Sequence, residues 1–243
     1  MRRFAKTLLG ACALSLPLCA FSMPAPAWIN RVFVASSGYQ QIDPGVYAPS
    51  SLSAADRQRA LADLAAARAR IAALYGAPNA RPVTILAADD REAARFGLAD
   101  GVPGTAFVTA AGTHVVLNLA HFSVDVTAHE LTHAELAERL GFWTRMTRLP
   151  VWLDEGLALQ LDWRPTYQVD CAAVGPERIH AVQAYDSVRK FWSGDVNAIV
   201  AHYQAARCAA AEVLAHYPAR DLYAGLTRVR RGESVDDVFR AAD

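Results

Sequence analysis

Hydrophobic and polar positions repeat with different periods along this chain, and the changes of period predict its elements. Residues 54–75 combine Ala, Leu and Arg with the spacing of an amphipathic helix. Ser53 begins this segment with the pattern of a capping box, and Gly76 follows its last residue. Before this helix, the apolar run from Trp28 to Ala35 favours a strand within an irregular arm that is rich in Pro, Gly and Ser.

The segments that follow favour short strands with one short helix between them. Residues 82–87 are rich in β-branched side chains and predict a strand, and residues 89–96 predict a short helix. The runs 105–109 and 113–119 lie on either side of a short turn segment. This arrangement predicts a β-hairpin.

From residue 123 onward nearly the whole pattern is helical. The front of the chain is therefore mixed and the back is α, which predicts an α+β fold. We expect a small N-terminal α/β lobe at residues 23–122, which includes the hairpin, and a helical C-terminal lobe at residues 123–243. The two lobes are expected to form one domain.

Composition and charge exclude several classes of protein. The chain has 243 residues, of which 53% are hydrophobic, and this share predicts a packed core. The 24 basic and 24 acidic side chains balance, which argues against a nucleic-acid partner because such proteins carry a basic excess. A long uncharged apolar run occurs only near the N-terminus, so the chain is not a multi-span membrane protein.

Residues 1–22 have the features of a secretory leader. Three basic side chains precede an apolar stretch that is too short to span a membrane comfortably. Small residues favour cleavage after Ser22, with cleavage near Ala25 or Ala27 as an alternative. An uncleaved membrane anchor is the other interpretation. Cleavage predicts a periplasmic or secreted protein without stable membrane insertion.

The cysteines give a second indication of export. Cleavage removes Cys12 and Cys19, so that Cys171 and Cys208 remain. Two cysteines in an oxidising compartment are expected to pair. A bridge across a loop of this length contributes about 3–4 kcal/mol in the chain-entropy model. Two buried free thiols are the alternative.

The sequence HELTH at residues 129–133 has the H-E-x-x-H pattern of zinc peptidases. Its segment has the signals of a helix, because Ser123 can cap its start and Gly141 can end it. The i, i+4 spacing places the imidazoles of His129 and His133 on one helix face, where both can bind one Zn²⁺ ion. Glu130 lies beside them and can act on a water molecule without binding the metal.

A catalytic zinc site needs a third protein ligand, and the segment PVWLDEGLA at residues 150–158 offers one. Here the chain resembles the gluzincin branch of zinc metallopeptidases, especially the bacterial peptidase MA-like proteins. In that group a second helix carries W-L-x-E-G-x-A, and its Glu completes the metal site. The resemblance implies a zincin-like fold and assigns the third ligand to Glu155. A solvated helix acid is the alternative, and Asp154 is interpreted as a surface or supporting residue.

The same resemblance implies a tyrosine that faces the metal from the start of a helix with the pattern Y-x-x-G/A/S. Tyr203 and the residues after it match this pattern. Tyr203 would donate a hydrogen bond to the oxyanion that forms during hydrolysis. A buried core tyrosine is the alternative, and Tyr167 and His180 are the substitutes for this role.

Other polar residues receive structural interpretations. Asp162 and Arg164 are expected to be structural, with orientation of ligands or anchoring of a substrate carboxylate as the alternative. The strand at residues 105–109 is expected to be an edge strand along which zincins hold an extended peptide. Four further histidines are interpreted as surface, loop or supporting residues: His114, His121, His202 and His216.

These features predict an exported, zinc-dependent metallopeptidase of the gluzincin type. Glu130 is the expected general base and Tyr203 the expected oxyanion donor, and the partner is a peptide or protein substrate. The G-x-M-E-N loop of aminopeptidases does not precede His129, which favours an endopeptidase or a specialised hydrolase. The alternatives are a zinc-stabilised exported binding or assembly protein without turnover, and a helical protein with a chance motif.

Overall fold

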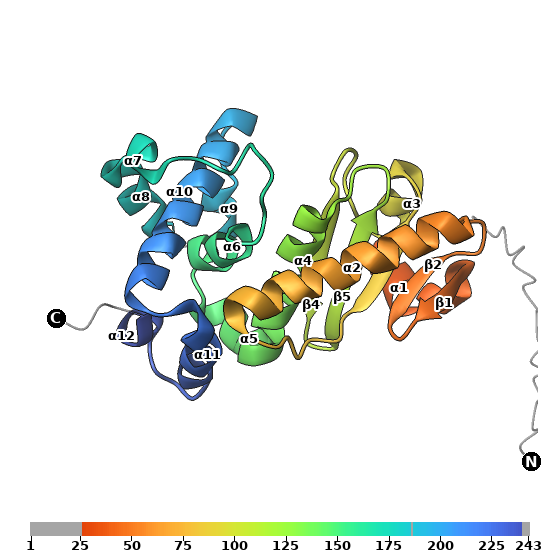
Figure 1. Ribbon diagram of the computed structural model, residues 1–243, viewed down its shortest axis with the longest axis horizontal. Coiled ribbons are helices and arrows are strands. Elements are labelled where there is room, and N and C mark those ends of the chain that lie inside the picture. Colours follow the sequence, from red (N-terminus) through yellow and green to blue (C-terminus); the bar gives the residue numbers. More distant parts are fainter. Residues whose placement is uncertain (1–25, 186, 240–243) are drawn as a thin grey trace, which may run out of the picture.

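The computed structural model describes residues 26–185 and 187–239, so the predicted leader at residues 1–22 lies outside the described residues. Figure 1 shows a sheet with its helices on one side of the molecule and a group of helices on the other. Every strand precedes residue 119, and every described element after that residue is helical. The predicted α+β class is therefore confirmed.

The sheet has five strands in the order β1-β2-β3-β5-β4. The three central strands run parallel to one another, and each outer strand is antiparallel to its neighbour. The predicted strand and hairpin are present, and β4 is an edge strand as expected. The first two strands lie in the arm that was predicted to be irregular. The bounds are β1 (Tyr39–Asp43), β2 (Val46–Pro49), β3 (Val83–Ala87), β4 (Gly104–Thr109) and β5 (Gly112–Asn118).

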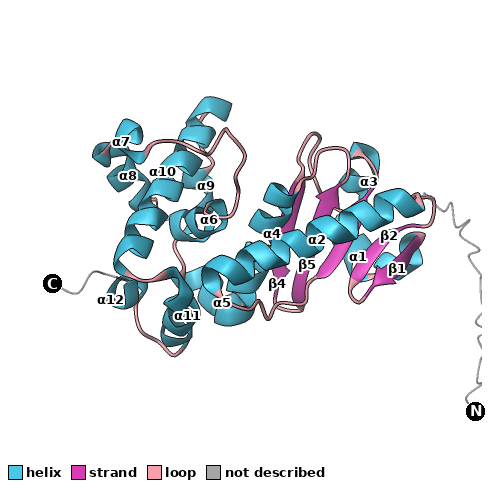
Figure 2. Cartoon of the chain, in the orientation of Figure 1, coloured by secondary structure: helices cyan, strands magenta, loops and turns pink. Residues whose placement is uncertain are grey.

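Helices cover both faces of this sheet because its central strands are apolar on both sides. On one face, Ile85 and Val116 pack with Phe96 beside α3 (Asp90–Arg95). On the other face, Val115 and Leu117 belong to the main core, which includes residues of α2 (Ala54–Tyr75) and α4 (Val124–Leu140). Figure 2 shows α2 running along the sheet towards the helical part of the molecule.

The prediction of a strand from Trp28 to Ala35 is wrong. This segment forms α1 (Ala27–Val32) and a 3-10 helix, η1 (Val34–Ser37). Within the run only Val34 is buried. The apolar run is too short for its period to separate a helix from a strand, and the edge of the sheet beside it is filled by β1 instead.

The long helix α2 is tied directly to the helix that carries the candidate third ligand. The Ser53 side chain accepts a hydrogen bond from the backbone N–H of Asp56, which confirms the predicted cap. At the other end, the buried Tyr75 hydroxyl donates to the carbonyl oxygen of Leu157 at 2.8 Å. The sheet lobe and the candidate site are therefore held together through α2.

The helical part is organised around the contact between α6 and α10. A Cβ atom at Gly156 would lie 2.3 Å from the carbonyl oxygen of Ala206, so the two helix backbones approach closely at this point. The bounds are α5 (Phe142–Arg148), α6 (Val151–Leu159), α7 (Cys171–Val174), α8 (Pro176–Gln183), α9 (Val188–Phe191), α10 (Val196–His216), η2 (Ala219–Asp221), α11 (Leu222–Arg230) and α12 (Val235–Phe239).

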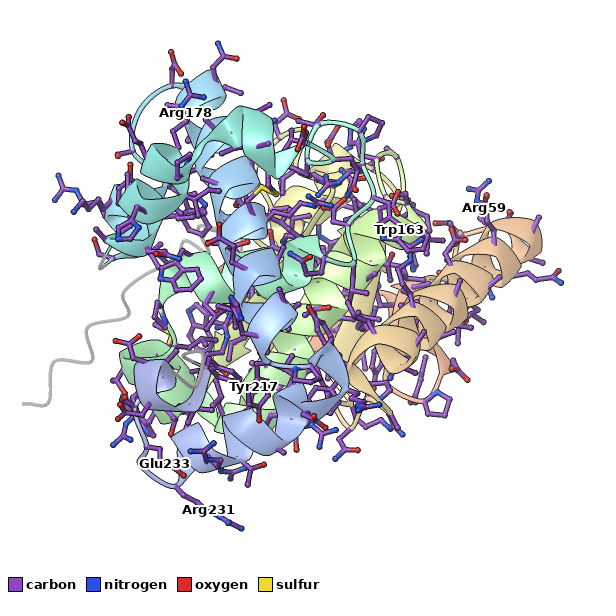
Figure 3. All side chains as sticks on the ribbon, turned by 60° about the vertical axis from the view of Figure 1, so that its left-hand side comes forward. Arg59, Trp163, Arg178, Tyr217, Arg231 and Glu233 are labelled. Atoms are coloured by element: carbon purple, nitrogen blue, oxygen red, sulfur yellow. A yellow bond between two sulfur atoms is a disulfide. The ribbon has the colours of Figure 1, made fainter. Side chains whose placement is uncertain are left out.

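A disulfide between Cys171 and Cys208 joins α7 to α10 and confirms the predicted pairing. Figure 3 shows the side chains of this part of the molecule, with charged residues such as Arg178 and Arg231 projecting from its periphery. The disulfide is compatible with an oxidising, exported location.

None of the helices among the described residues combines the length and the apolar character that a membrane crossing needs.

Candidate metal centre

Two helices bring the predicted ligands together. α4 begins at the predicted cap, where the Ser123 side chain accepts from the backbone N–H of Val126, and it ends at Gly141. α6 begins directly after Pro150, which occupies the capping position rather than the first helical position. Because each helix is packed into the core, their facing side chains have defined positions.

His129, His133 and Glu155 form a compact triangle of donor atoms. The Nε2 atoms of the two imidazoles lie 3.1 Å apart. The Oε2 atom of Glu155 lies 3.4 Å from each of these nitrogens. In a tetrahedral zinc site the ligand atoms lie about 3.3–3.4 Å apart, given bond lengths of about 2.0–2.1 Å. The triangle therefore has the size of one face of such a tetrahedron, and these residues could hold a metal ion.

Burial and an unsatisfied carboxylate oxygen agree with this interpretation. All three side chains are buried. The Oε2 atom of Glu155 has no hydrogen-bond partner in the described part of the chain. A buried carboxylate oxygen without a hydrogen bond is costly unless an ion pair or a metal ion compensates its charge. In the metal-free site the two imidazoles at 3.4 Å are its ion-pair partners. The donor set of two imidazoles and one carboxylate, together with this oxygen, fits a divalent cation such as Zn²⁺.

Each imidazole has a carboxylate at its other nitrogen. Asp154 accepts a hydrogen bond from Nδ1 of His133 at 2.8 Å. Oδ2 of Asp162 lies 3.4 Å from Nδ1 of His129. A carboxylate in this position fixes the orientation of a metal-binding imidazole and raises its basicity. The position of Asp162 agrees with the alternative in which it orients a ligand. Asp154 is buried beside His133, which agrees with a supporting rather than a surface position.

Arginines hold these two carboxylates in turn. Arg145 on α5 lies 2.5 Å from the second oxygen of Asp154. Arg164 makes an ion pair with Asp162, whose side chain is fully buried. Burial raises the pKa of Asp162, but the hydrogen bonds from Arg164 and the nearby imidazole of His129 lower it below its ordinary value. Asp162 therefore remains charged beside the imidazole of His129.

The electrostatics of the metal-free site favour positive charge between the carboxylates. Burial alone lowers the pKa of His129, but the contacts with Asp162 and Glu155 outweigh it and raise the pKa to about 9. Burial also lowers the pKa of His133, and Glu155 and Asp154 raise it well above its ordinary value. Burial raises the pKa of Glu155, but the two imidazoles lower it below its ordinary value. A divalent cation would supply the positive charge that these carboxylates favour.

Glu130 lies with the triangle on the wall of a cavity of about 1030 Å³. β4 approaches this part of α4 so closely that a Cβ atom at Gly104 would lie 3.1 Å from Cγ of Glu130. The six residues of β4 line the cavity, and so do residues 145–151, mostly of α5. The cavity gives the candidate metal centre access from the edge strand of the sheet.

Tyr203 also lines this cavity, but it does not begin a helix. It lies inside α10, seven residues after the helix begins, so the prediction that it begins a helix is wrong. Its hydroxyl accepts a hydrogen bond from the indole N–H of Trp192 at 2.9 Å. Burial and the carboxylate of Glu155 raise the pKa of Tyr203, so its hydroxyl keeps its proton at neutral pH.

The two substitutes for Tyr203 are not among the residues that line the cavity. Tyr167 packs against Tyr203, with ring centroids 5.6 Å apart, and His180 is exposed on α8. The other histidines have structural contacts or surface positions, as expected. His121 pairs with Asp90, and His202 contacts the hydroxyl of Tyr185. His216 is exposed. His114 lies on β5, where burial lowers its pKa.

Sequence reasoning missed two residues of this site, Arg145 and Trp192. Both line the cavity. Trp192 contacts the predicted site residue Tyr203, and Arg145 contacts Asp154, which was interpreted as a surface or supporting residue. Neither stands in a recognisable motif, because each contact joins segments that are about ten residues apart and meet only in the folded chain.

Comparisons with protein-family models, with curated proteins and with solved structures find no match for this chain.

Proposed function

We propose that this protein is an exported zinc metallopeptidase of the gluzincin type, with a zincin-like catalytic domain. The observation that carries the proposal is the triangle of His129, His133 and Glu155, which has the size of one face of a tetrahedral zinc site. Three protein ligands leave the fourth position for water or substrate, whereas structural zinc sites have four. The cavity beside the triangle provides the access that a substrate needs.

In this mechanism zinc, when bound, supplies Lewis-acid activation of water and of the scissile carbonyl group. The Glu130 carboxylate takes one proton from the attacking water and passes it to the leaving amine, so the proton balance closes within each turnover. The Tyr203 hydroxyl donates a hydrogen bond to the oxygen that gains negative charge. Asp154 and Asp162 keep the two imidazoles oriented throughout.

The cavity suits an extended peptide with apolar side chains. β4 is an edge strand, so its free backbone groups can pair with a peptide backbone. Exposed apolar side chains also line the cavity, where Met146, Val188 and Trp192 are each roughly half exposed. Apolar substrate side chains would cover this surface. We therefore infer that the substrate is a peptide or an unfolded protein segment.

The test is cleavage of a peptide library by the zinc-loaded protein and by its Glu130→Gln variant. This substitution removes the general base, and turnover should fall at least about 10²–10⁴-fold. Zinc content, measured by elemental analysis, should stay at one ion per chain. The control is Glu138→Gln, because Glu138 is exposed on the same helix two turns later.

Three outcomes would contradict the proposal. A Glu130→Gln variant that cleaves peptides at the wild-type rate would exclude Glu130 as the base. A wild-type protein that binds one zinc ion and cleaves no peptide in the library would favour the alternative of a zinc-stabilised binding or assembly protein. A protein that binds no zinc would contradict both interpretations.

A further inference from the structure

The contact between Trp192 and Tyr203 determines where the proton of the tyrosine hydroxyl can go. An indole N–H can only donate, so the Tyr203 oxygen is the acceptor in this 2.9 Å hydrogen bond. In the described part of the chain, Trp192 is the one hydrogen-bond partner of this hydroxyl. The hydroxyl proton therefore remains available for an acceptor in the cavity, which both side chains line.

The main chain beside Trp192 is held firmly. The neighbouring Phe191 is fully buried and packs edge-on against Tyr203, with ring centroids 5.2 Å apart. The Phe191 carbonyl oxygen lies 2.7 Å from Nδ1 of His202, and because a carbonyl only accepts, this nitrogen donates. The other ring nitrogen of His202 lies 3.1 Å from the Tyr185 hydroxyl. The end of α9 is thus tied to α10 one turn or less from Tyr203.

We propose that Trp192 is a positioning residue that aims the Tyr203 hydroxyl proton at the reacting oxygen beside the metal centre. The inference rests on the proposed function, in which Tyr203 donates to that oxygen. A phenol hydroxyl can rotate about its C–O bond, and a fixed donor on one side of the oxygen leaves fewer directions for its proton. The hydrogen bond of Trp192 supplies this restriction before a substrate binds, which is the preorganisation that oxyanion stabilisation requires.

The experiment measures binding of acetohydroxamate to the Co²⁺-loaded protein by visible absorption, so it does not depend on peptide cleavage. This small ligand binds metals through oxygen atoms and is too small to need the apolar walls of the cavity. Tyr203→Phe removes the donor to the bound oxygen, and Trp192→Phe removes only the indole N–H and part of the ring. Each variant should weaken acetohydroxamate binding about threefold to tenfold, the value of one hydrogen bond.

The double variant separates a positioning role from an independent one. If Trp192 acts through Tyr203, the variant with both substitutions should bind acetohydroxamate as weakly as Tyr203→Phe alone. The control is Trp143→Phe, because Trp143 is exposed on α5 and is not among the residues that line the cavity. This control should bind acetohydroxamate as the wild type does, and all variants should bind Co²⁺ with equal affinity.

A second readout reports the hydrogen bond itself. In metal-free protein labelled with ¹³C at the tyrosine Cζ atoms, Trp192→Phe should move the Tyr203 resonance, and Trp143→Phe should leave it in place. The proposal is overturned if Trp192→Phe leaves acetohydroxamate binding or the Tyr203 resonance unchanged, or if the losses of the two single variants multiply in the double variant. A coupled loss in a protein that cleaves no peptide would support this inference and contradict the proposed function.

Discussion

Each imidazole at the candidate metal centre has one nitrogen directed at Glu155 and the other directed at an aspartate. The Nδ1 atom of His133 donates to Asp154, and that of His129 lies 3.4 Å from Asp162. This arrangement selects the tautomer that presents Nε2 to a metal. In the proposed site the aspartates would therefore act on the metal through the imidazoles, without binding it themselves.

The substitutions Asp154→Asn and Asp162→Asn should each lower zinc affinity about 10–100-fold while the fold is retained. An amide cannot hold the imidazole as a charged carboxylate does, so the ligand loses both orientation and basicity. Competition with a fluorescent zinc chelator measures the affinity, and Asp100→Asn is the control because Asp100 is exposed. Wild-type affinity in both variants would show that the aspartates do not support the ligands.

Zinc binding should release protons at neutral pH. The pKa of His129 in the metal-free site is about 9, so its ring is protonated at pH 7. A metal ligand must be neutral imidazole, and binding therefore displaces at least this proton. Zinc affinity should rise at least about tenfold per pH unit between pH 7 and pH 9.

Isothermal titration calorimetry in two buffers of different ionisation enthalpy measures the number of protons released at pH 7. Glu155 contributes none, because its pKa is lowered below its ordinary value and it is already charged. Equal heats in the two buffers would mean that no proton is released. That result would contradict the raised pKa of His129.

At the scale of elements, sequence patterns predicted those helices and strands whose ends carry side-chain signals. Ser53 and Ser123 cap the helices that begin after them, and the hairpin turn separates two runs of strand-forming residues. The run from Trp28 to Ala35 has no such signal, and its apolar residues fit a strand or a helix. β1 and β2 were missed because they pair across a tight turn at Gly45 within a segment that reads as loop.

The residues of the candidate metal centre also divide into those with a local sequence signal and those without one. His129, Glu130 and His133 were predictable because the spacing of their motif reflects the helix period. Glu155 was assigned only through the resemblance of its segment to the second gluzincin motif. The contact of Trp192 with Tyr203 was not predictable, because no local period links a short helix to the interior of the next one. Packing between elements decides such contacts, and a single sequence carries no direct signal of it.

The close contact of α6 with α10 makes Gly156 a sensitive position. In Gly156→Ala the new methyl group would lie 2.3 Å from the Ala206 carbonyl oxygen and 2.7 Å from Cβ of Ala210. The helices must separate, which should lower the free energy of unfolding by about 3 kcal/mol and displace Glu155 on the same helix. Urea denaturation measures the stability, and zinc affinity should fall with it.

A control for this substitution adds one atom to α10 where there is room. Ala215→Ser places a hydroxyl on an exposed position near the end of the helix and should change the free energy of unfolding by less than about 0.5 kcal/mol. If Gly156→Ala were as stable as this control, the two backbones would not be in close contact at Gly156.

At the scale of the whole molecule, the free edge of the sheet lines the cavity beside the candidate metal centre. The backbone N–H of Asn118 donates to the Pro103 carbonyl oxygen, and this bond fixes which β4 residues pair with β5. Hydrogen-bonded pairs recur at every second residue, so Thr105 uses its backbone groups within the sheet. The backbone groups of Ala106 face the free edge, where an extended peptide can pair with them.

Two proline substitutions on adjacent residues separate peptide binding from the stability of the sheet. Ala106→Pro removes an N–H that faces the free edge, so it should raise the KM for peptides about fivefold to tenfold through the loss of one hydrogen bond. The free energy of unfolding should change little. Thr105→Pro removes an N–H that donates within the sheet and should lower the free energy of unfolding instead. Peptide-cleavage kinetics and urea denaturation of both variants test this, and an unchanged KM in Ala106→Pro would show that substrates do not extend the sheet along β4.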